Sequence, residues 1–114
     1  MSMCTKNQLS ELLQTVAEKS KEIFGDDLHS VILYGSYARG HYDDESDIDI
    51  MILADVSDSE LRSFRSQIDS LCGTLLYDYG VVVSITERDT ETYYRYADIL
   101  PFYRNIQQEG VRIA

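Results

Sequence analysis

The chain has 114 residues, 44% of them hydrophobic and 26% charged, which is a globular composition and excludes a disordered chain. Its formal net charge of −10 argues against binding along an extended nucleic acid, because phosphate neutralisation needs stripes of Lys and Arg. No apolar run approaches the roughly 20 residues of a membrane span, and the N-terminus lacks a signal-peptide layout, so we expect a cytoplasmic protein without membrane association. The length predicts a single domain over residues 1–114.

The first predicted element is an amphipathic helix over about residues 6–24. Thr5 and Gln8 have the spacing of a capping box, and apolar residues then recur with helical periodicity up to Phe24. The next segment, residues 28–34, carries apolar side chains on both faces, which predicts a central strand.

A turn through Gly35-Ser36 leads to a second predicted strand over residues 47–53. Asp47 and Asp49 alternate there with isoleucines, so both carboxylates share one face of the strand. A second capping pair, Ser57 and Glu60, then predicts the start of a helix that Gly73 would end or weaken.

Residues 81–86 are β-branched almost throughout and predict a third strand. Asp89 or Thr90 is expected to cap a short helix, and Pro101 suits the first position of a last one. Residues 111–114 are expected to add a fourth, edge strand. The element order indicates an α/β (α+β) domain, with a small mixed β-sheet of three core strands packed with helices.

The turn after the first strand predicts a phosphate-binding site. Gly35 permits a ligand to approach the backbone closely. A short helix beginning at Ser36 would aim free N–H groups, together with the Ser36 hydroxyl, at one anion. Taken alone, however, Gly-Ser after a strand is an ordinary turn.

Asp47 and Asp49 predict a metal site. Two residues apart on a strand, they lie roughly 6.6 Å apart along the backbone. They can converge on a hard cation, Mg²⁺ or Mn²⁺, whose remaining ligands are substrate phosphates and water. An isolated Asp-x-Asp is more often a solvated strand edge, so this prediction depends on its conjunction with the Gly35-Ser36 turn.

Two neighbouring features leave alternatives open. Arg39 either contacts phosphate or pairs structurally with the acidic run that follows it. That run, residues 43–45, is interpreted as an acidic surface loop.

The combined pattern points to a family. Ten residues separate Ser36 from Asp47, and Ala38-Arg39-Gly40 and Ser46 lie between them. This arrangement resembles the minimal nucleotidyltransferases of the DNA polymerase β superfamily over about residues 28–54, and residues 100–110 resemble the tail of some standalone members.

The resemblance implies a reaction in which an acceptor hydroxyl attacks the α-phosphate of a nucleoside triphosphate, expected to be ATP, and releases pyrophosphate. It implies that Gly35 and Ser36 hold the β- and γ-phosphates. It also implies that Asp47 and Asp49 bind two Mg²⁺ ions and are the catalytic carboxylates.

The sequence departs from the family pattern on the third strand. Active members generally carry a third carboxylate there, whereas Ser84 occupies the expected position. Serine supplies no negative charge and is a poor Mg²⁺ ligand beside carboxylate. Asp78 and Glu87 flank the predicted strand and would reach the site only if the strand boundaries differ.

Two functions from different classes follow. The first is nucleotide transfer to a partner protein, for which the resemblance suggests a HEPN-domain toxin, with this chain as its antitoxin. The alternative is a catalytically degenerate relative that binds a nucleotide and a partner. The tyrosines of the last helices would either form that interface or pack on the sheet: Tyr93, Tyr94, Tyr96 and Tyr103. Modification of a small molecule is least favoured, because the chain lacks room for an acceptor domain.

Overall fold

A computed structural model gives the fold, and residues 5–43 and 45–114 are described in it. The strands are β1 (Leu28–Tyr34), β2 (Ile48–Ala54), β3 (Val83–Asp89) and β4 (Val111–Arg112). The α-helices are α1 (Lys6–Phe24), α2 (Gly35–Arg39), α3 (Asp58–Ser63), α4 (Arg65–Tyr79), α5 (Thr90–Tyr96) and α6 (Pro101–Glu109), and a 3₁₀ turn, η1 (Gly25–Asp27), links α1 to β1.

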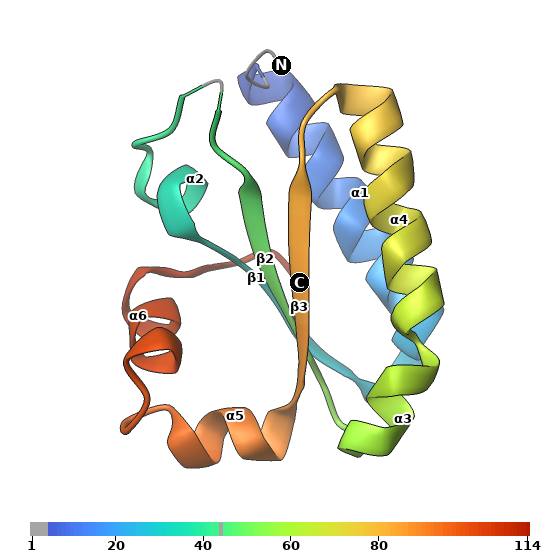
Figure 1. Cartoon of the computed structure of the whole chain (residues 1–114), viewed down its shortest axis with the longest axis vertical. Helices are drawn as coiled ribbons and strands as arrows, with labels where there is room; N and C mark the ends of the chain where they lie inside the picture. Colours follow the sequence, from blue (N-terminus) through green and yellow to red (C-terminus); the bar gives the residue numbers. More distant parts are fainter. Residues whose placement is uncertain (1–4, 44) are drawn as a thin grey trace.

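The strands form one mixed sheet of order β3-β2-β1-β4. β1 runs antiparallel to both β2 and β4, whereas β2 and β3 are parallel. Helices α1, α3 and α4 cover one face of this sheet, and α2, α5 and α6 lie on the other (Figure 1). The predicted α+β fold with a mixed sheet and a fourth strand at its edge is therefore confirmed.

Local sequence explains where α1 begins. The Thr5 side chain accepts a hydrogen bond from the Gln8 N–H, and the Gln8 side chain accepts one from the Thr5 N–H, so the predicted capping box is present. The buried face of the helix, Leu12, Val16 and Phe24 among its residues, joins the larger core beneath the sheet.

β1 and β2 are the two inner strands of the sheet, as predicted for residues 28–34, and β2 is buried on both faces. Ile48, Ile50 and Ile52 face the larger core with α1 and α4, and each is fully buried. Met51 and Leu53 face a smaller core on the side of α5 and α6. Asp47 and Asp49 continue this second face toward the start of the strand, where no helix covers them as completely.

The smaller core shows which tyrosines of the last helices pack on the sheet and which remain exposed. Tyr93 and Tyr103 are buried against Met51 and Leu53, which is the packing alternative. Tyr94 and Tyr96 are exposed, so only these two are available to a partner.

Several predicted boundaries were wrong. The second strand was predicted over residues 47–53, but β2 begins at Ile48, so Asp47 lies just before it. β3 begins two residues later than predicted and extends to Asp89, because its charged end is accommodated at the edge of the sheet. The helix capped by Ser57 divides at Phe64 into α3 and α4. Gly73 does not end α4; Gly80 does, with a left-handed backbone at φ +67°.

No helix within the described ranges is both long and apolar enough to cross a membrane.

Candidate active site

The site is built on the turn from β1 into α2. Gly35 has φ +75°, and a Cβ atom there would collide with the Asp49 carboxylate. Glycine suits the left-handed backbone, and the absence of a Cβ lets the Asp49 carboxylate lie close to the turn. The structure brings the predicted phosphate turn and the predicted carboxylate together.

The start of α2 offers free backbone donors. The helix is short, and its N-cap residue, Tyr34, makes no side-chain hydrogen bond to it. The first N–H groups, with the partly buried Ser36 next to them, are thus left without a side-chain acceptor. This arrangement suits an anion such as a phosphate.

Asp49 lies near the start of β2, where it pairs with Tyr34 of β1 on one side and with Ser84 of β3 on the other. Burial raises the pKa of Asp49, the charge of Asp47 raises it further, and Arg39 lowers it. Asp47 precedes β2 and is exposed. Two carboxylates that repel one another in this way favour a cation between them.

The donor set fits a magnesium ion whose coordination a substrate completes. Within the described part of the chain, no group of three or more His, Cys, Asp and Glu side chains could hold a metal. Mg²⁺ usually binds through one or two carboxylates together with phosphates and water, and Asp47 and Asp49 meet that requirement.

Arg39 makes a contact that neither sequence alternative included. Its guanidinium Nη1 lies 3.2 Å from Oε2 of Glu109 at the end of α6. Both side chains are nearly half exposed, so the pair is weak and can open to another partner. A phosphate contact by Arg39 stays a prediction.

The described residues of the acidic run form a loop held by hydrogen bonds between its own residues. The Asp43 carboxylate accepts hydrogen bonds from the Glu45 N–H and from the Ser46 hydroxyl. Asp43 and Glu45 are both exposed, as expected of a surface loop, whereas Asp44 lies outside the described residues.

On β3, the position beside Asp49 is occupied by a serine. Ser84 pairs in register with Asp49, on the same face of the sheet, and is exposed. Asp78 belongs to α4 and not to the strand. The neighbour of Asp49 on β3 is therefore a hydroxyl group.

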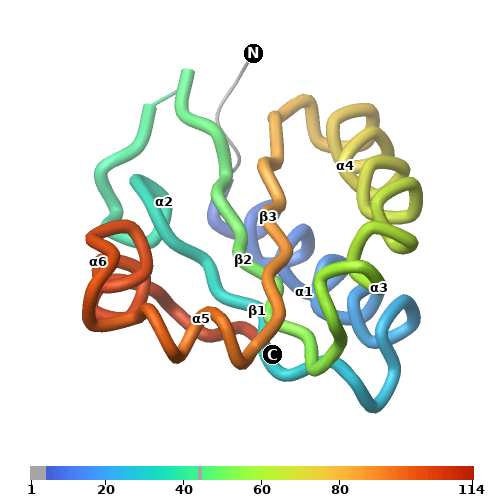
Figure 2. Tube along the Cα trace, turned by 60° about the horizontal axis from the view of Figure 1, so that its bottom comes forward, coloured from blue at the N-terminus to red at the C-terminus, as the bar shows by residue number. Residues whose placement is uncertain are grey.

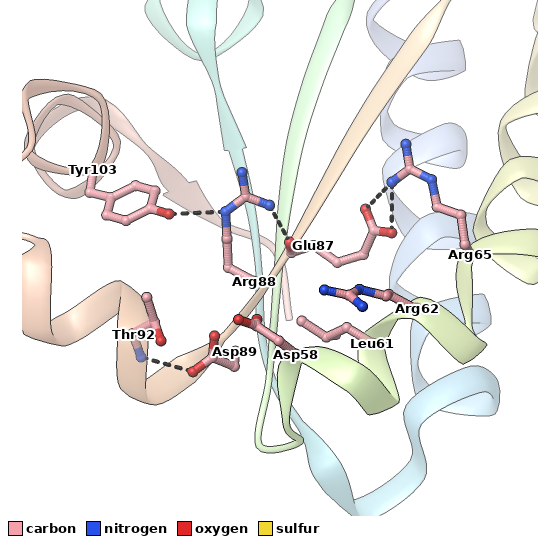
Figure 3. A pocket seen from close by; sticks show the side chains of 9 residues that line it. All are labelled: Asp58, Leu61, Arg62, Arg65, Glu87, Arg88, Asp89, Thr92 and Tyr103. Atoms are coloured by element: carbon pink, nitrogen blue, oxygen red, sulfur yellow. Dashed lines mark hydrogen bonds and ion pairs between the residues drawn. The ribbon is translucent and has the colours of Figure 1, made fainter.

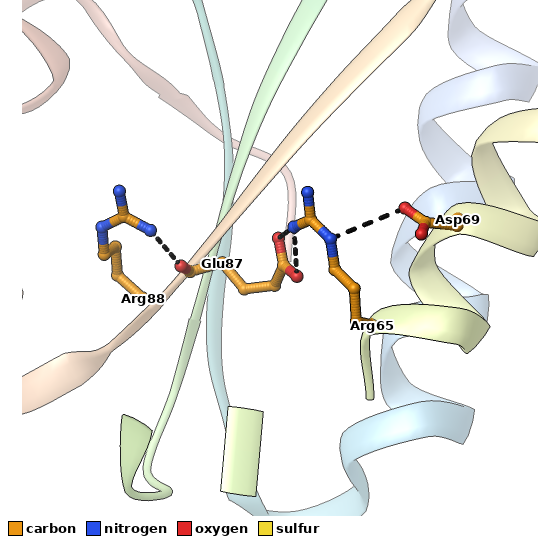
Figure 4. Close-up of polar contacts among 4 residues, drawn as sticks. All are labelled: Arg65, Asp69, Glu87 and Arg88. Atoms are coloured by element: carbon orange, nitrogen blue, oxygen red, sulfur yellow. Dashed lines mark hydrogen bonds and ion pairs between the residues drawn. The ribbon is translucent and has the colours of Figure 1, made fainter. Parts of the chain in front are cut away.

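Glu87 does not replace the missing carboxylate, although it lies within β3. It pairs with Ile52, so its side chain points to the opposite face of the sheet from Asp49. There its two oxygens lie 2.9 and 3.0 Å from Nη1 of Arg65, and Nε of Arg65 lies 3.7 Å from Oδ1 of Asp69 (Figure 4). Glu87 is a buried structural acid.

Aromatic residues line the floor and wall of the site, which the sequence pattern did not predict. Tyr34 lies beside Asp49, and its pKa is raised first by burial and also by the Asp49 charge, against a lowering by a hydrogen bond to Thr86. The Phe102 ring packs edge-on against Tyr34 at a centroid distance of 5.7 Å. A cleft of about 170 Å³ runs between these rings, Gly35, Arg39 and the exposed side of α6.

A larger hollow of about 580 Å³ lies at the far end of β3, beyond the predicted site. Arg88 there donates from Nε to the Tyr103 hydroxyl and from Nη1 to the Glu87 carbonyl, and Asp89 caps α5 by accepting from the Thr92 N–H (Figure 3). Its charged groups are three arginines and three acids, so its lining favours no single sign of charge.

Comparison with known proteins agrees with this geometry. The family model described as "Nucleotidyltransferase domain" matches residues 9–111. A protein of Methanocaldococcus jannaschii, named "Putative protein adenylyltransferase MJ0604", is 42% identical over 83 residues, which are 73% of this chain and 75% of that protein.

Solved structures share the fold at lower identity. A toxin–antitoxin with AMP-PNP has a TM-score of 0.56 at 20% identity and covers 90% of this chain and 72% of its own. A tri-AMPylated Shewanella oneidensis HEPN toxin in complex with its MNT antitoxin has a TM-score of 0.52 at 17% identity, with 92% and 71% covered. The resemblance predicted from the sequence motif is thus confirmed.

Proposed function

Because this chain belongs to the nucleotidyltransferase domain family, we propose that it transfers AMP from ATP to a hydroxyl group of a partner protein. The observation that carries the proposal is the contact between the Gly35 turn and the Asp49 carboxylate. This contact joins a phosphate-binding helix start to a metal-binding strand in one site.

The triphosphate would bind at the start of α2. Gly35 and Ser36 would hold the β- and γ-phosphates with their backbone N–H groups and the Ser36 hydroxyl. Arg39 would leave its exposed contact with Glu109 and add a positive charge there.

Asp47 and Asp49 would hold Mg²⁺, or Mn²⁺, against the bound phosphates. When bound, the metal neutralises phosphate charge and polarises the α-phosphorus toward attack. The two carboxylates orient this charge, and the contact of Asp49 with Gly35 fixes where it acts.

The acceptor hydroxyl attacks the α-phosphorus, a new phosphorus–oxygen bond forms, and the bond to the β-phosphate oxygen breaks to release pyrophosphate. The proton of the acceptor hydroxyl would pass to water, because the β3 residue beside Asp49 is Ser84 and not a carboxylate. General-base assistance is worth about 10²–10⁴-fold, so the reaction would be slower than with a third carboxylate.

A partner protein is the proposed acceptor, because a similar protein is named "Putative protein adenylyltransferase MJ0604". One structure of similar fold contains a tri-AMPylated HEPN toxin in complex with an MNT antitoxin. We therefore propose a HEPN-type toxin as the partner, with this chain as the antitoxin. The exposed Tyr94 and Tyr96 provide aromatic surface for such a contact.

The second candidate is a binding module that no longer transfers, and one observation favours it: Ser84 in register with Asp49. Such a protein would neutralise its partner by contact. It would bind Mg²⁺ and ATP without consuming the nucleotide.

Intact-mass spectrometry of the partner separates the two candidates. The purified chain would be incubated with ATP, Mg²⁺ or Mn²⁺, and the HEPN-type product of a neighbouring gene. We expect the partner to gain one or more AMP groups, and the Asp47→Asn/Asp49→Asn variant to add none. A partner of unchanged mass, bound to a chain that still binds ATP, would establish the binding module instead.

A further inference from the structure

We propose that the exposed side of α6 is the nucleoside subsite, in which Phe102 stacks on the base and Asn105 recognises an adenine edge. This inference rests on the proposed function and adds to it the residues that would select ATP. Helices α2 and α6 lie side by side in both views of the chain (Figures 1 and 2).

Phe102 is a large aromatic ring on the wall of the site. Its side chain is 45% exposed, and its ring meets that of Tyr34 edge-on. Tyr34 in turn pairs with Asp49. Only one side chain therefore separates this ring from the predicted metal ligand, a separation that a bound nucleotide easily spans. Aromatic rings bind nucleic-acid bases by stacking, whatever the base.

Asn105 lies one helical turn after Phe102, on the same side of α6. It is exposed, and its amide makes no hydrogen bond among the described residues. An amide offers one acceptor and two donors, which match the amino group and a ring nitrogen of adenine. The buried residues Tyr103 and Ile106 pack into the smaller core and hold the helix in place, and Ile106 also lines the cleft.

The size and position of the cleft fit the base of a nucleotide. Its volume of about 170 Å³ is below the roughly 300–1,000 Å³ of pockets that enclose a whole ligand. Its lining includes Gly35 and Arg39, where the phosphates are proposed to bind, together with Phe102, Asn105 and Glu109 of α6. An open subsite of this kind takes part of a ligand whose charged remainder binds next to it.

Calorimetric titration of the purified chain tests the subsite through binding. Mg²⁺ with ATP, GTP or inorganic tripolyphosphate would each be titrated into the wild type and into Phe102→Ala. Stacking on one aromatic side chain is worth about 5- to 150-fold in affinity. We expect Phe102→Ala to weaken ATP binding within that range and to leave tripolyphosphate binding unchanged. The matched control is Tyr77→Ala, which removes an aromatic ring 90% exposed on α4.

Asn105→Asp tests recognition of the base without removing a packed side chain. An aspartate cannot donate to adenine, but it accepts hydrogen bonds from guanine. We expect ATP affinity to fall about 5- to 100-fold and the preference to move toward GTP.

Distinct results overturn distinct claims. If the wild type binds ATP and tripolyphosphate equally tightly, or if both variants keep wild-type ATP affinity, the nucleoside subsite is wrong while the proposed function stands. If the wild type binds neither ligand, the proposed function fails and this inference fails with it.

Discussion

Gly35 combines a left-handed backbone with a close approach to the Asp49 side chain. Its left-handed backbone disfavours a side chain, and an added Cβ would displace the end of the Asp49 side chain. We expect Gly35→Ala to lower the free energy of unfolding by about 1–3 kcal/mol from backbone strain, and to lose nucleotide binding because the Asp49 carboxylate is moved. Chemical denaturation measures the change in stability.

Gly40→Ala is the matched control, because Gly40 has nearly the same φ, +74°, with no atom within 4 Å of an added Cβ. It should show the backbone strain alone and retain nucleotide binding. Nucleotide binding retained equally by the two variants would contradict a role for the close approach of Gly35 and Asp49.

Asp49 should reduce the stability of the free protein. Burial and the Asp47 charge raise its folded-state pKa, so the charged carboxylate is disfavoured in the folded chain at neutral pH. We expect Asp49→Asn to raise the melting temperature while abolishing nucleotide binding. Asp98→Asn removes one charge from an exposed position and is the control for net charge.

The sign of the pH dependence follows from the direction of the shift. As the pH falls through the raised pKa of Asp49, the wild-type carboxyl takes up a proton and loses the charge that burial disfavours. The advantage of Asp49→Asn should therefore be present near neutral pH and shrink on acidification. An advantage that grows on acidification would argue against the raised pKa.

The sequence motif indicated candidate site residues, but it did not indicate which residues from distant parts of the chain lie next to them. Gly35, Ser36, Asp47 and Asp49 came from one motif, because spacing along adjacent elements limits where they can meet. Phe102 and Asn105 belong to a helix more than fifty positions away, and only the tertiary packing of α6 beside α2 brings them to the site. The Arg39–Glu109 pair was missed for the same reason.

Among the elements, β3 decides how complete the site is. Its parallel register with β2 places Ser84 beside Asp49. Ser84→Asp would restore a carboxylate there, and we expect it to increase the rate of AMP transfer by about 10²–10⁴-fold. Single-turnover kinetics with the partner protein would measure this rate.

Ser84→Asn is the control, since it has a similar size and no charge. A rate that rises equally in both variants would assign the effect to polarity. Unchanged transfer by Ser84→Asp would show that a carboxylate at this position is not what the site lacks.

The opposite face of β3 should affect stability alone. The Glu87 side chain is 6% exposed and bonded to Arg65. We expect Glu87→Gln to lower the free energy of unfolding by about 1–3 kcal/mol, because a buried charge-assisted hydrogen bond is weakened. Nucleotide affinity should be unchanged, and a loss of affinity in the folded variant would place Glu87 in the site after all.

The errors in the predicted elements have physical causes. Val81 and Val82 have high strand propensity, but the left-handed turn at Gly80 delays the ladder to Val83. The charged residues Glu87 to Asp89 predicted the end of the strand, yet an ion pair, a hydrogen bond and a helix cap accommodate them at the sheet edge. Local propensity cannot anticipate partners supplied by other elements.

At the scale of the whole molecule, the sheet separates most of the hydrophobic core from the candidate site. The face covered by α1, α3 and α4 contains most of the core, and the face carrying α2, α5 and α6 presents the site (Figure 1). The net charge of −10 makes a bound divalent cation the natural bridge to a triphosphate. The same charge favours a partner with a basic surface.

Transfer of label from ATP to the partner protein tests the central claim most directly. The chain, Mg²⁺ and the HEPN-type partner would be incubated with ATP radiolabelled on either its α- or its γ-phosphate. We predict that the α-label becomes covalently attached to the partner, that the γ-label leaves as pyrophosphate, and that Asp47→Asn/Asp49→Asn attaches neither. Retention of the γ-label on the partner, or attachment of the α-label that the double variant supports equally, would contradict AMP transfer by this site.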